Sequence, residues 1–212
     1  MKGWLFWGTL AGATAVTVAV CWGMWVWVIT PANLAVKTAN RLHESFERDF
    51  PITPRIQANA GALFAQKSSV ENLLLLDREI EVIEKIESAL PDGTTLELRA
   101  GFSAQAGVAT REPFLLNVRR GGAVVDAALP KARILKIEMA APEILSPQGI
   151  VWEAIPESSR SKSTRILERR ARRLLTEQGL LDDAKNEMRR RVSALVESVG
   201  GKVEFSKDNA ER

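Results

Sequence analysis

Residues 165–191 read RILERRARRLLTEQGLLDDAKNEMRRR, and this stretch decides the fold of the C-terminal third of the chain. Before and after Gly179, mainly apolar residues recur at steps of three and four. This spacing places them on one face of a helix and predicts two consecutive amphipathic helices. The first stripe consists of Leu167, Ala171, Leu174 and Gln178, and the second of Leu181, Ala184, Met188, Val192, Leu195 and Val199. Gly200 and Gly201 are expected to end the second helix, because glycine is favoured just past a helix C-terminus.

The arginines of this stretch raise the question of a partner. A DNA-reading helix-turn-helix presents the first turn of its second helix to the bases, but here that turn carries Asp182 and Asp183, which repel phosphate. Nucleic acid is therefore not an expected partner. Two interpretations stay open: a solvated face with helix pairs such as Glu168–Arg172, and a surface that contacts anionic lipid. The candidate contacts to such a surface are Arg169, Arg170, Arg172 and Arg173.

The region before these helices is rich in predicted strands. From Asp77 to Glu87, Ile80 and Val82 alternate with Glu79 and Glu81, which indicates a half-buried strand, although helical spacing also fits this segment. Further strands are expected over residues 94–108, 114–118, 123–129, 133–139 and 202–206. We expect these strands to form one small sheet with a solvated face.

Turns and a helix complete the pattern of the middle region. Gly121 and Gly122 predict a tight hairpin turn, and 91–93 (Pro-Asp-Gly) predict another turn. Residues 32–50 are expected to form a helix that acts as a stalk, with an ordinary surface helix as the alternative. Its stripe at four-residue steps is Leu34, Thr38, Leu42 and Phe46.

The N-terminal segment from Trp4 to Ile29 predicts a membrane anchor. No charged residue lies between Lys2 and Lys37, and the apolar run exceeds the roughly 20 residues that span a bilayer. Tryptophans mark both ends, as is typical of the lipid headgroup level. A cleaved signal peptide, with an apolar region of about 7–15 residues, fits this run less well. The anchor is therefore expected to stay in the mature chain.

Small residues follow one face of the predicted anchor. They recur at steps of three and four, and the first two form a GxxxG motif, which lets two helix backbones approach closely in lipid. These candidate packing residues are Gly8, Gly12, Ala15, Ala19 and Gly23. They predict self-association or contact with another membrane protein. Positive charges on the two flanks nearly balance, and the very short N-terminal tail favours a soluble domain outside the cytoplasm.

Composition and motifs point to no chemistry. The chain has 212 residues and a net charge of +3, with a single cysteine and a single histidine, Cys21 and His43, which cannot form a closed tetrahedral metal site. No phosphate-binding loop, nucleophile elbow or dinucleotide fingerprint is present. The acidic residues Glu79, Glu81, Glu84 and Glu87 are interpreted as the wet face of a strand. No catalytic, metal-ligating or cofactor-binding residue is identified, and no cofactor is expected.

Several short motifs follow one another between about Val70 and Phe205. They are Leu129-Pro130-x-Ala132-x-Ile134-Leu135 leading into Ile137-Glu138, then Ala171-Arg172, Gly179-Leu180-Leu181-x-x-Ala184 and Leu195-x-x-x-x-Gly200. In these motifs and their order the stretch resembles a bacterial family, domain of unknown function 4230. The chain departs from the family pattern before Leu129, where a more acidic G-x-D-L turn is expected and residues 107–117 stand instead. The resemblance implies an anchor, a strand-rich region and two helices, and it implies no catalytic residue.

Together these observations predict an α+β protein with an N-terminal transmembrane helix, a small antiparallel or mixed sheet and two C-terminal amphipathic helices. The expected parts are an anchor over 1–30, a stalk over 31–52, a soluble domain over 53–206 and a polar tail over 207–212. The expected function is non-enzymatic assembly or partner binding by a single-pass protein at a membrane surface. A membrane-associated enzyme with an unrecognised site and an anionic-lipid-binding module are the alternatives. An exposed apolar stripe would favour assembly, and a concave pocket with convergent polar groups would favour an enzyme.

Overall fold

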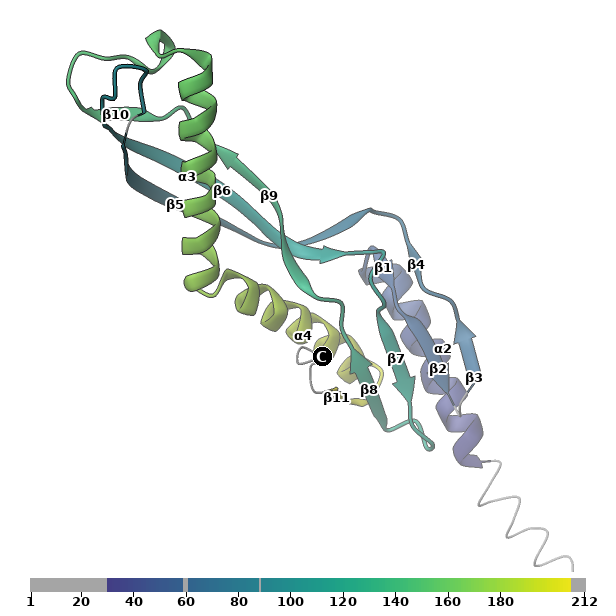
Figure 1. The fold of residues 1–212 in the computed structure, drawn as a ribbon. Coiled ribbons are helices and arrows are strands. Elements are labelled where there is room, and N and C mark those ends of the chain that lie inside the picture. The colour runs from purple at the N-terminus through teal and green to yellow at the C-terminus, as the bar shows by residue number, and fades with distance from the viewer. Residues whose placement is uncertain (1–29, 59–60, 88, 207–212) are drawn as a thin grey trace, which may run out of the picture. The chain divides into compact units, whose positions relative to one another are not determined.

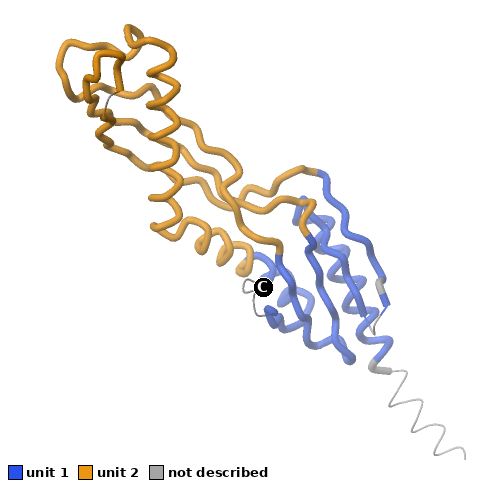
Figure 2. Tube along the Cα trace, viewed as in Figure 1, with its two compact units in different colours: residues 1–69, 113–129, 191–212 blue, residues 70–112, 130–190 orange. Residues whose placement is uncertain are grey.

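The computed structural model describes residues 30–206 except 59, 60 and 88, and these residues form two compact units (Figures 1 and 2). In the described part, unit 1 comprises residues 30–69, 113–129 and 191–206, and unit 2 comprises 70–112 and 130–190. None of the helices in this part has the length and apolarity needed to cross a bilayer. The expected anchor, with Gly8, Gly12, Ala15, Ala19 and Gly23, lies outside the described residues.

Unit 1 is built on a five-stranded mixed sheet. Its strands are β2 (Arg55–Ala58), β3 (Gly61–Phe64), β7 (Leu115–Val118), β8 (Val124–Ala128) and β11 (Lys202–Phe205). They lie in the order β11-β8-β7-β2-β3, with β11–β8 and β2–β7 parallel and the other neighbours antiparallel. The short strands β1 (Ile52–Thr53) and β4 (Lys67–Ser68) form a separate antiparallel pair.

Helix α2 (Thr30–Asp49) packs its apolar side onto the sheet of unit 1. Its buried stripe includes Ala35, Ala39, Leu42 and Phe46, so the expected stripe is right at Leu42 and Phe46 but is displaced by one residue at its start, where Leu34 is 47% exposed. The ring of Phe46 meets that of Phe114 edge to face, with centroids 5.8 Å apart. The helix is thus part of the core of unit 1.

The predicted hairpin turn is confirmed and lies against α2. The amide of Arg119 donates to the carbonyl of Val124 at 2.9 Å, which closes the turn between β7 and β8. Gly122 has φ +74°, and a Cβ at this position would lie 2.8 Å from the carbonyl oxygen of Leu34. Glycine is required here for both reasons, because other residues resist positive φ and would strike the helix backbone.

Unit 2 is built on a four-stranded antiparallel sheet. Its long central strand β6 (Leu96–Ala109) pairs along one side with β5 (Asn72–Ile86). Along the other side β6 pairs with β9 (Ala132–Met139) and with β10 (Glu143–Ser146). The strand prediction for residues 77–87 is therefore confirmed, and the alternative helical reading of this segment is wrong.

Two helices follow the sheet in the chain. After the 3-10 turn η2 (Trp152–Ala154), α3 (Glu157–Glu177) packs against β5 in unit 2. Gly179, with φ +76°, separates α3 from α4 (Leu180–Ser198), of which residues 180–190 belong to unit 2 and 191–198 to unit 1. The apolar core between sheet and α3 includes Val82, Ile86, Leu96, Leu98, Ala100, Phe102, Leu167 and Ala171.

The α+β prediction is confirmed, and so are the two consecutive C-terminal helices. The prediction of one small sheet is corrected, because β5, β6, β9 and β10 form one sheet while β7, β8 and β11 join β2 and β3 in another. Alternation of apolar and polar residues predicts a strand but not the strands with which it pairs. The division into two sheets could therefore not be predicted from the alternation. Strand β10 was not among the predicted strands.

Candidate functional site

The sheet of unit 2 has two chemically different faces. Even-numbered residues of β5 from Leu76 to Ile86 turn towards the helices, where Val82 and Ile86 are buried. Odd-numbered residues from Asp77 to Lys85 point the other way and are exposed. This opposite face carries charged side chains from four strands, and within unit 2 the contacts of α3 are made to the other face. We call it the uncovered face.

A hollow of about 910 Å³ lies on the uncovered face around Gly101. Three short runs of adjacent strands line it: Glu79, Ile80 and Glu81 of β5, Gly101, Phe102 and Ser103 of β6, and Glu138, Met139 and Ala140 at the end of β9. At Gly101 the floor is bare: a Cβ there would find Ala140 Cβ as its nearest neighbour, at 3.8 Å. Small side chains on the central strand, between longer ones on its neighbours, thus leave a depression in the sheet surface.

Register places two carboxylates on opposite walls of this hollow. Ser103 pairs with Glu79 on β5 and with Glu138 on β9, so these three residues form one row across the sheet. Two strand spacings, about 10 Å, separate the backbones that carry the two glutamates. Glu81 lies on the same strand as Glu79, opposite Gly101. We call Glu79, Glu81 and Glu138 the acidic walls.

The acidic walls are exposed to solvent, and two of the three carboxylates have an ion-pair partner on the surface. Glu81 lies 3.7 Å from Arg99, and Glu138 lies 2.5 Å from Lys136. The two carboxylate side chains are 61% and 60% exposed, and exposed pairs of this kind contribute about 0–1 kcal/mol each. Glu79 has no ion pair or hydrogen bond through its side chain to any described residue. The hollow is therefore an open acidic surface that can exchange its partners.

A second charged surface runs along the outer side of α3. Ser163, Leu167, Ala171 and Leu175 are the buried side of this helix. At 100° per residue, the opposite side carries the exposed residues Arg165, Arg169, Arg172 and Arg173, which we call the arginine stripe. No ion pair to any of the four is found within the described ranges, and Arg165 and Arg169 donate to carbonyls of their own helix.

The structure separates Arg170 from the other arginines proposed as surface contacts. Arg170 turns towards β5 and lies 3.5 Å from Glu84, with both side chains about one-third exposed. A second pair of this kind joins Arg78 of β5 to Asp183 of α4 at 2.6 Å, and Arg78 also donates to the carbonyl of Gln178. These pairs fasten the helices to the sheet, whereas Arg169, Arg172 and Arg173 remain free to meet another surface.

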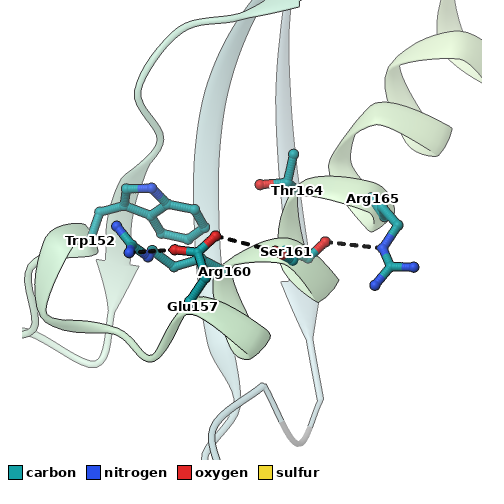
Figure 3. Close-up of a pocket in the computed structure, with 6 residues that line it drawn as sticks. All are labelled: Trp152, Glu157, Arg160, Ser161, Thr164 and Arg165. Carbon is teal, nitrogen blue, oxygen red and sulfur yellow. Dashed lines mark hydrogen bonds and ion pairs between the residues drawn. The ribbon is translucent and has the colours of Figure 1, made fainter.

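A smaller cavity of about 560 Å³ lies at the start of α3 (Figure 3). Most of its polar side chains are paired with one another, and Nε of Arg160 is buried without a hydrogen-bond partner among the described residues. Arg160 donates to Glu157 at 2.5 Å, the Ser161 hydroxyl donates to the other oxygen of Glu157 at 3.4 Å, and Arg165 donates to the Ser161 carbonyl at 3.3 Å. Because Glu157 neutralises Arg160 inside this cavity, its polar groups do not converge on an empty centre.

The remaining sequence candidates serve packing and turns. Glu84 faces α3, and Glu87 follows the end of β5, so neither joins Glu79 and Glu81 at the hollow. His43 stacks on Phe64 with ring centroids 3.9 Å apart and is 22% exposed. No group of metal-ligating side chains is found among residues 30–206 as described.

Two pKa shifts belong to structural contacts away from the hollow. Hydrogen bonds from Thr94 lower the pKa of Asp92 in the turn between β5 and β6. A hydrogen bond from Arg119 to Asp126 raises the pKa of Arg119, and Glu204 adds to this effect from β11. Arg119 therefore ties three strands of unit 1 together.

The acidic walls were missed in the sequence because they come from strands far apart in the chain. The alternation at Glu79 and Glu81 did indicate the wet side of a strand. Glu138 and Gly101 could be added only once the register of β6 with β5 and β9 was in hand. A glycine within a predicted strand was the one local signal, since it marks a place where a side chain is missing.

Comparison of the chain with protein-family models, with curated proteins and with solved structures finds no match. The resemblance to domain of unknown function 4230 stays a prediction that rests on the motifs quoted for it.

Proposed function

We propose that this protein is a single-pass, membrane-anchored assembly module without enzymatic turnover, whose unit 2 joins copies of the chain at the membrane surface. The observation that carries the proposal is the pair of oppositely charged surfaces on unit 2, the acidic walls on the sheet and the arginine stripe on α3. Both are exposed, and they face away from each other across the sheet. The membrane-anchored part of the proposal is supported by the sequence, through the predicted anchor at Trp4–Ile29 and the resemblance to a bacterial membrane-anchored family.

An exposed apolar stripe would have favoured assembly, but the exposed large apolar side chains are scattered over several elements. They are Leu34, Val36, Leu63, Val70, Leu74, Ile83 and Val151. Charge complementarity, and not apolar burial, supports association. It predicts that high salt dissociates the assemblies, because 1 M salt shortens the Debye length to about 3 Å and so screens the attraction.

The test is the size of the full-length protein in a neutral bilayer. We expect chemical crosslinking in phosphatidylcholine vesicles to give products of more than one chain, and mass photometry in nanodiscs to agree. A chain that remains monomeric in both, over the concentrations at which it is expressed, would contradict the proposal.

Within the anchor, Gly12→Leu is expected to lower crosslinking between anchors several-fold, because a bulky residue in GxxxG keeps two helix backbones apart. Leu10→Ala, which changes the same segment away from the small-residue face, is the matched control. Equal crosslinking of Gly12→Leu and wild type would show that the small-residue face of the anchor does not contribute to assembly. Association would then have to come from the soluble domain.

A second candidate function is binding to anionic lipid. The observation that favours it is the arginine stripe itself, since each basic residue near an anionic surface contributes about 1 kcal/mol. Co-sedimentation with vesicles that contain phosphatidylserine, compared with phosphatidylcholine alone, measures this directly.

A further inference from the structure

We infer that the arginine stripe of one copy docks onto the acidic walls of a second copy, so that the chains associate front to back. This inference rests on the proposed function and names the two surfaces that meet. The stripe consists of Arg165, Arg169, Arg172 and Arg173, and the walls consist of Glu79, Glu81 and Glu138.

The first argument is the chemistry of the two surfaces. The stripe offers guanidinium groups without a carboxylate partner in the described chain, and the hollow offers carboxylates that are unpaired or held only by exposed cations. Guanidinium binds carboxylate through two parallel hydrogen bonds, which gives direction as well as attraction. The chain thus carries both halves of a strong recognition pair on its own surface.

The second argument is size. Along α3, Arg165 and Arg173 are about 12 Å apart, taking a helix rise of 1.5 Å per residue. On the sheet, Glu79 and Glu81 are about 7 Å apart along β5, and Glu138 lies about 10 Å across from Glu79. The bare floor at Gly101 leaves room between these walls for an arginine side chain to lie flat. The two charged patches therefore match in extent.

The third argument is direction. The stripe lies opposite the buried side of α3, and the walls lie on the sheet face that α3 does not cover. One copy therefore cannot satisfy its own walls with its own stripe. A contact between two copies leaves a free stripe on one and free walls on the other, so further copies add in the same sense. Such a contact builds closed rings or open filaments and differs from a two-fold dimer.

The fourth argument separates a second copy from a lipid surface. An anionic membrane would engage the stripe but would not reach the acidic walls on the opposite face, so it would leave the hollow unexplained. A second copy uses both surfaces at once.

The experiment is a charge swap in the full-length protein, reconstituted in phosphatidylcholine nanodiscs and vesicles. The helix-reversed variant carries Arg169→Glu, Arg172→Glu and Arg173→Glu. The sheet-reversed variant carries Glu79→Lys, Glu81→Lys and Glu138→Lys. We expect each variant alone to associate about tenfold more weakly than wild type or worse, because like charges then face each other. An equimolar mixture of the two is expected to recover association, as is a single chain with all six changes.

Two controls carry the same change in net charge at exposed positions in other parts of the chain. The first control variant carries Lys37→Glu, Arg55→Glu and Arg120→Glu, and the second carries Glu44→Lys, Glu153→Lys and Glu197→Lys. Neutral variants, with Arg→Gln on the stripe or Glu→Gln on the walls, test the same contact if a reversed chain does not fold by circular dichroism. They should weaken association by a smaller factor than reversal does.

The outcomes are separable. Recovery of association in the mixture, with both controls at the wild-type level, supports the front-to-back contact. Loss in each single variant without recovery in the mixture overturns it, as does wild-type association of the reversed chains, while assembly itself still stands. A wild-type chain that is monomeric overturns the proposed function together with this inference. If helix reversal abolishes binding to phosphatidylserine vesicles but leaves association in neutral lipid unchanged, the stripe serves the membrane and the inference is wrong.

Discussion

The two faces of the unit 2 sheet are made by the same strands and have opposite physical roles. Towards α3, residues such as Val82, Leu98 and Phe102 are almost fully buried, and this face holds the unit together. On the other side, Glu79 and Glu81 stand in solvent around a bare glycine. Because neighbouring residues of a strand point to opposite faces, stability and recognition can change independently of each other. Substitutions one position apart should therefore have different consequences.

The largest contrast is expected between Phe102 and its neighbours on the uncovered face. Phe102 is 2% exposed and lies in the core beneath α3, so Phe102→Ala should cost about 3–5 kcal/mol of unfolding free energy through lost burial and the cavity left behind. Glu79→Ala should change the unfolding free energy by no more than about 0.5 kcal/mol. Urea unfolding followed by circular dichroism in detergent measures both. Similar losses for the two variants would break the distinction between the faces.

A sharper test compares two glycines of the same strand. A Cβ on Gly107 would lie 2.0 Å from the carbonyl oxygen of Leu73 and 2.8 Å from Leu135 Cδ1, so Gly107→Ala must displace the β5 backbone. We expect it to cost about 2–3 kcal/mol, as overpacking of a closed site does. Gly101→Ala meets nothing nearer than 3.8 Å and should leave the unfolding midpoint close to that of wild type. If Gly107→Ala unfolds at the wild-type urea concentration, the close approach of β5 and β6 at this point is wrong.

The smallest predicted effect is a rise in the unfolding free energy. It concerns a residue of α3 that packs towards the covered face of the sheet. Ser163 of α3 is fully buried, and its hydroxyl has no hydrogen-bond partner. Removing an unsatisfied buried hydroxyl relieves its desolvation cost, so Ser163→Ala should raise the unfolding free energy by about 1 kcal/mol. Ser158→Ala, at an exposed position of the same helix, serves as the control. A destabilised Ser163→Ala protein would mean that the hydroxyl has a partner in solution.

Local sequence patterns predicted the elements more fully than the surfaces. Helical spacing on either side of Gly179 led to α3 and α4, and alternation at Glu79–Val82 led to β5. The glycine pair at 121–122 led to the β7–β8 hairpin. In each case the signal lies within a few residues of chain, where backbone geometry alone relates the side chains.

The candidate site was predicted only in fragments. The four arginines proposed as one surface separate in the structure, since Arg170 reaches Glu84 while Arg169, Arg172 and Arg173 face outward. On the sheet, Glu79 and Glu81 were predicted to lie on the solvent-exposed face of a strand, but Glu138 was not associated with them. These residues are 59 and 57 positions from Glu138 by subtraction of their numbers, and only strand pairing brings them together.

The sequence by itself determined the α+β class, the two amphipathic helices with their glycine break, and the apolar N-terminal run that predicts an anchor. Short-range periodicity carries this information, because each helix or strand relates nearby residues in a fixed geometry. Only the tertiary structure decided which strands share a sheet, which face α3 covers and where the acidic walls meet. The physical reason is the register of the long β5–β6 hairpin. Shifting β5 by one residue would exchange its two faces. The local sequence pattern does not specify which residue of β6 lies opposite a given residue of β5.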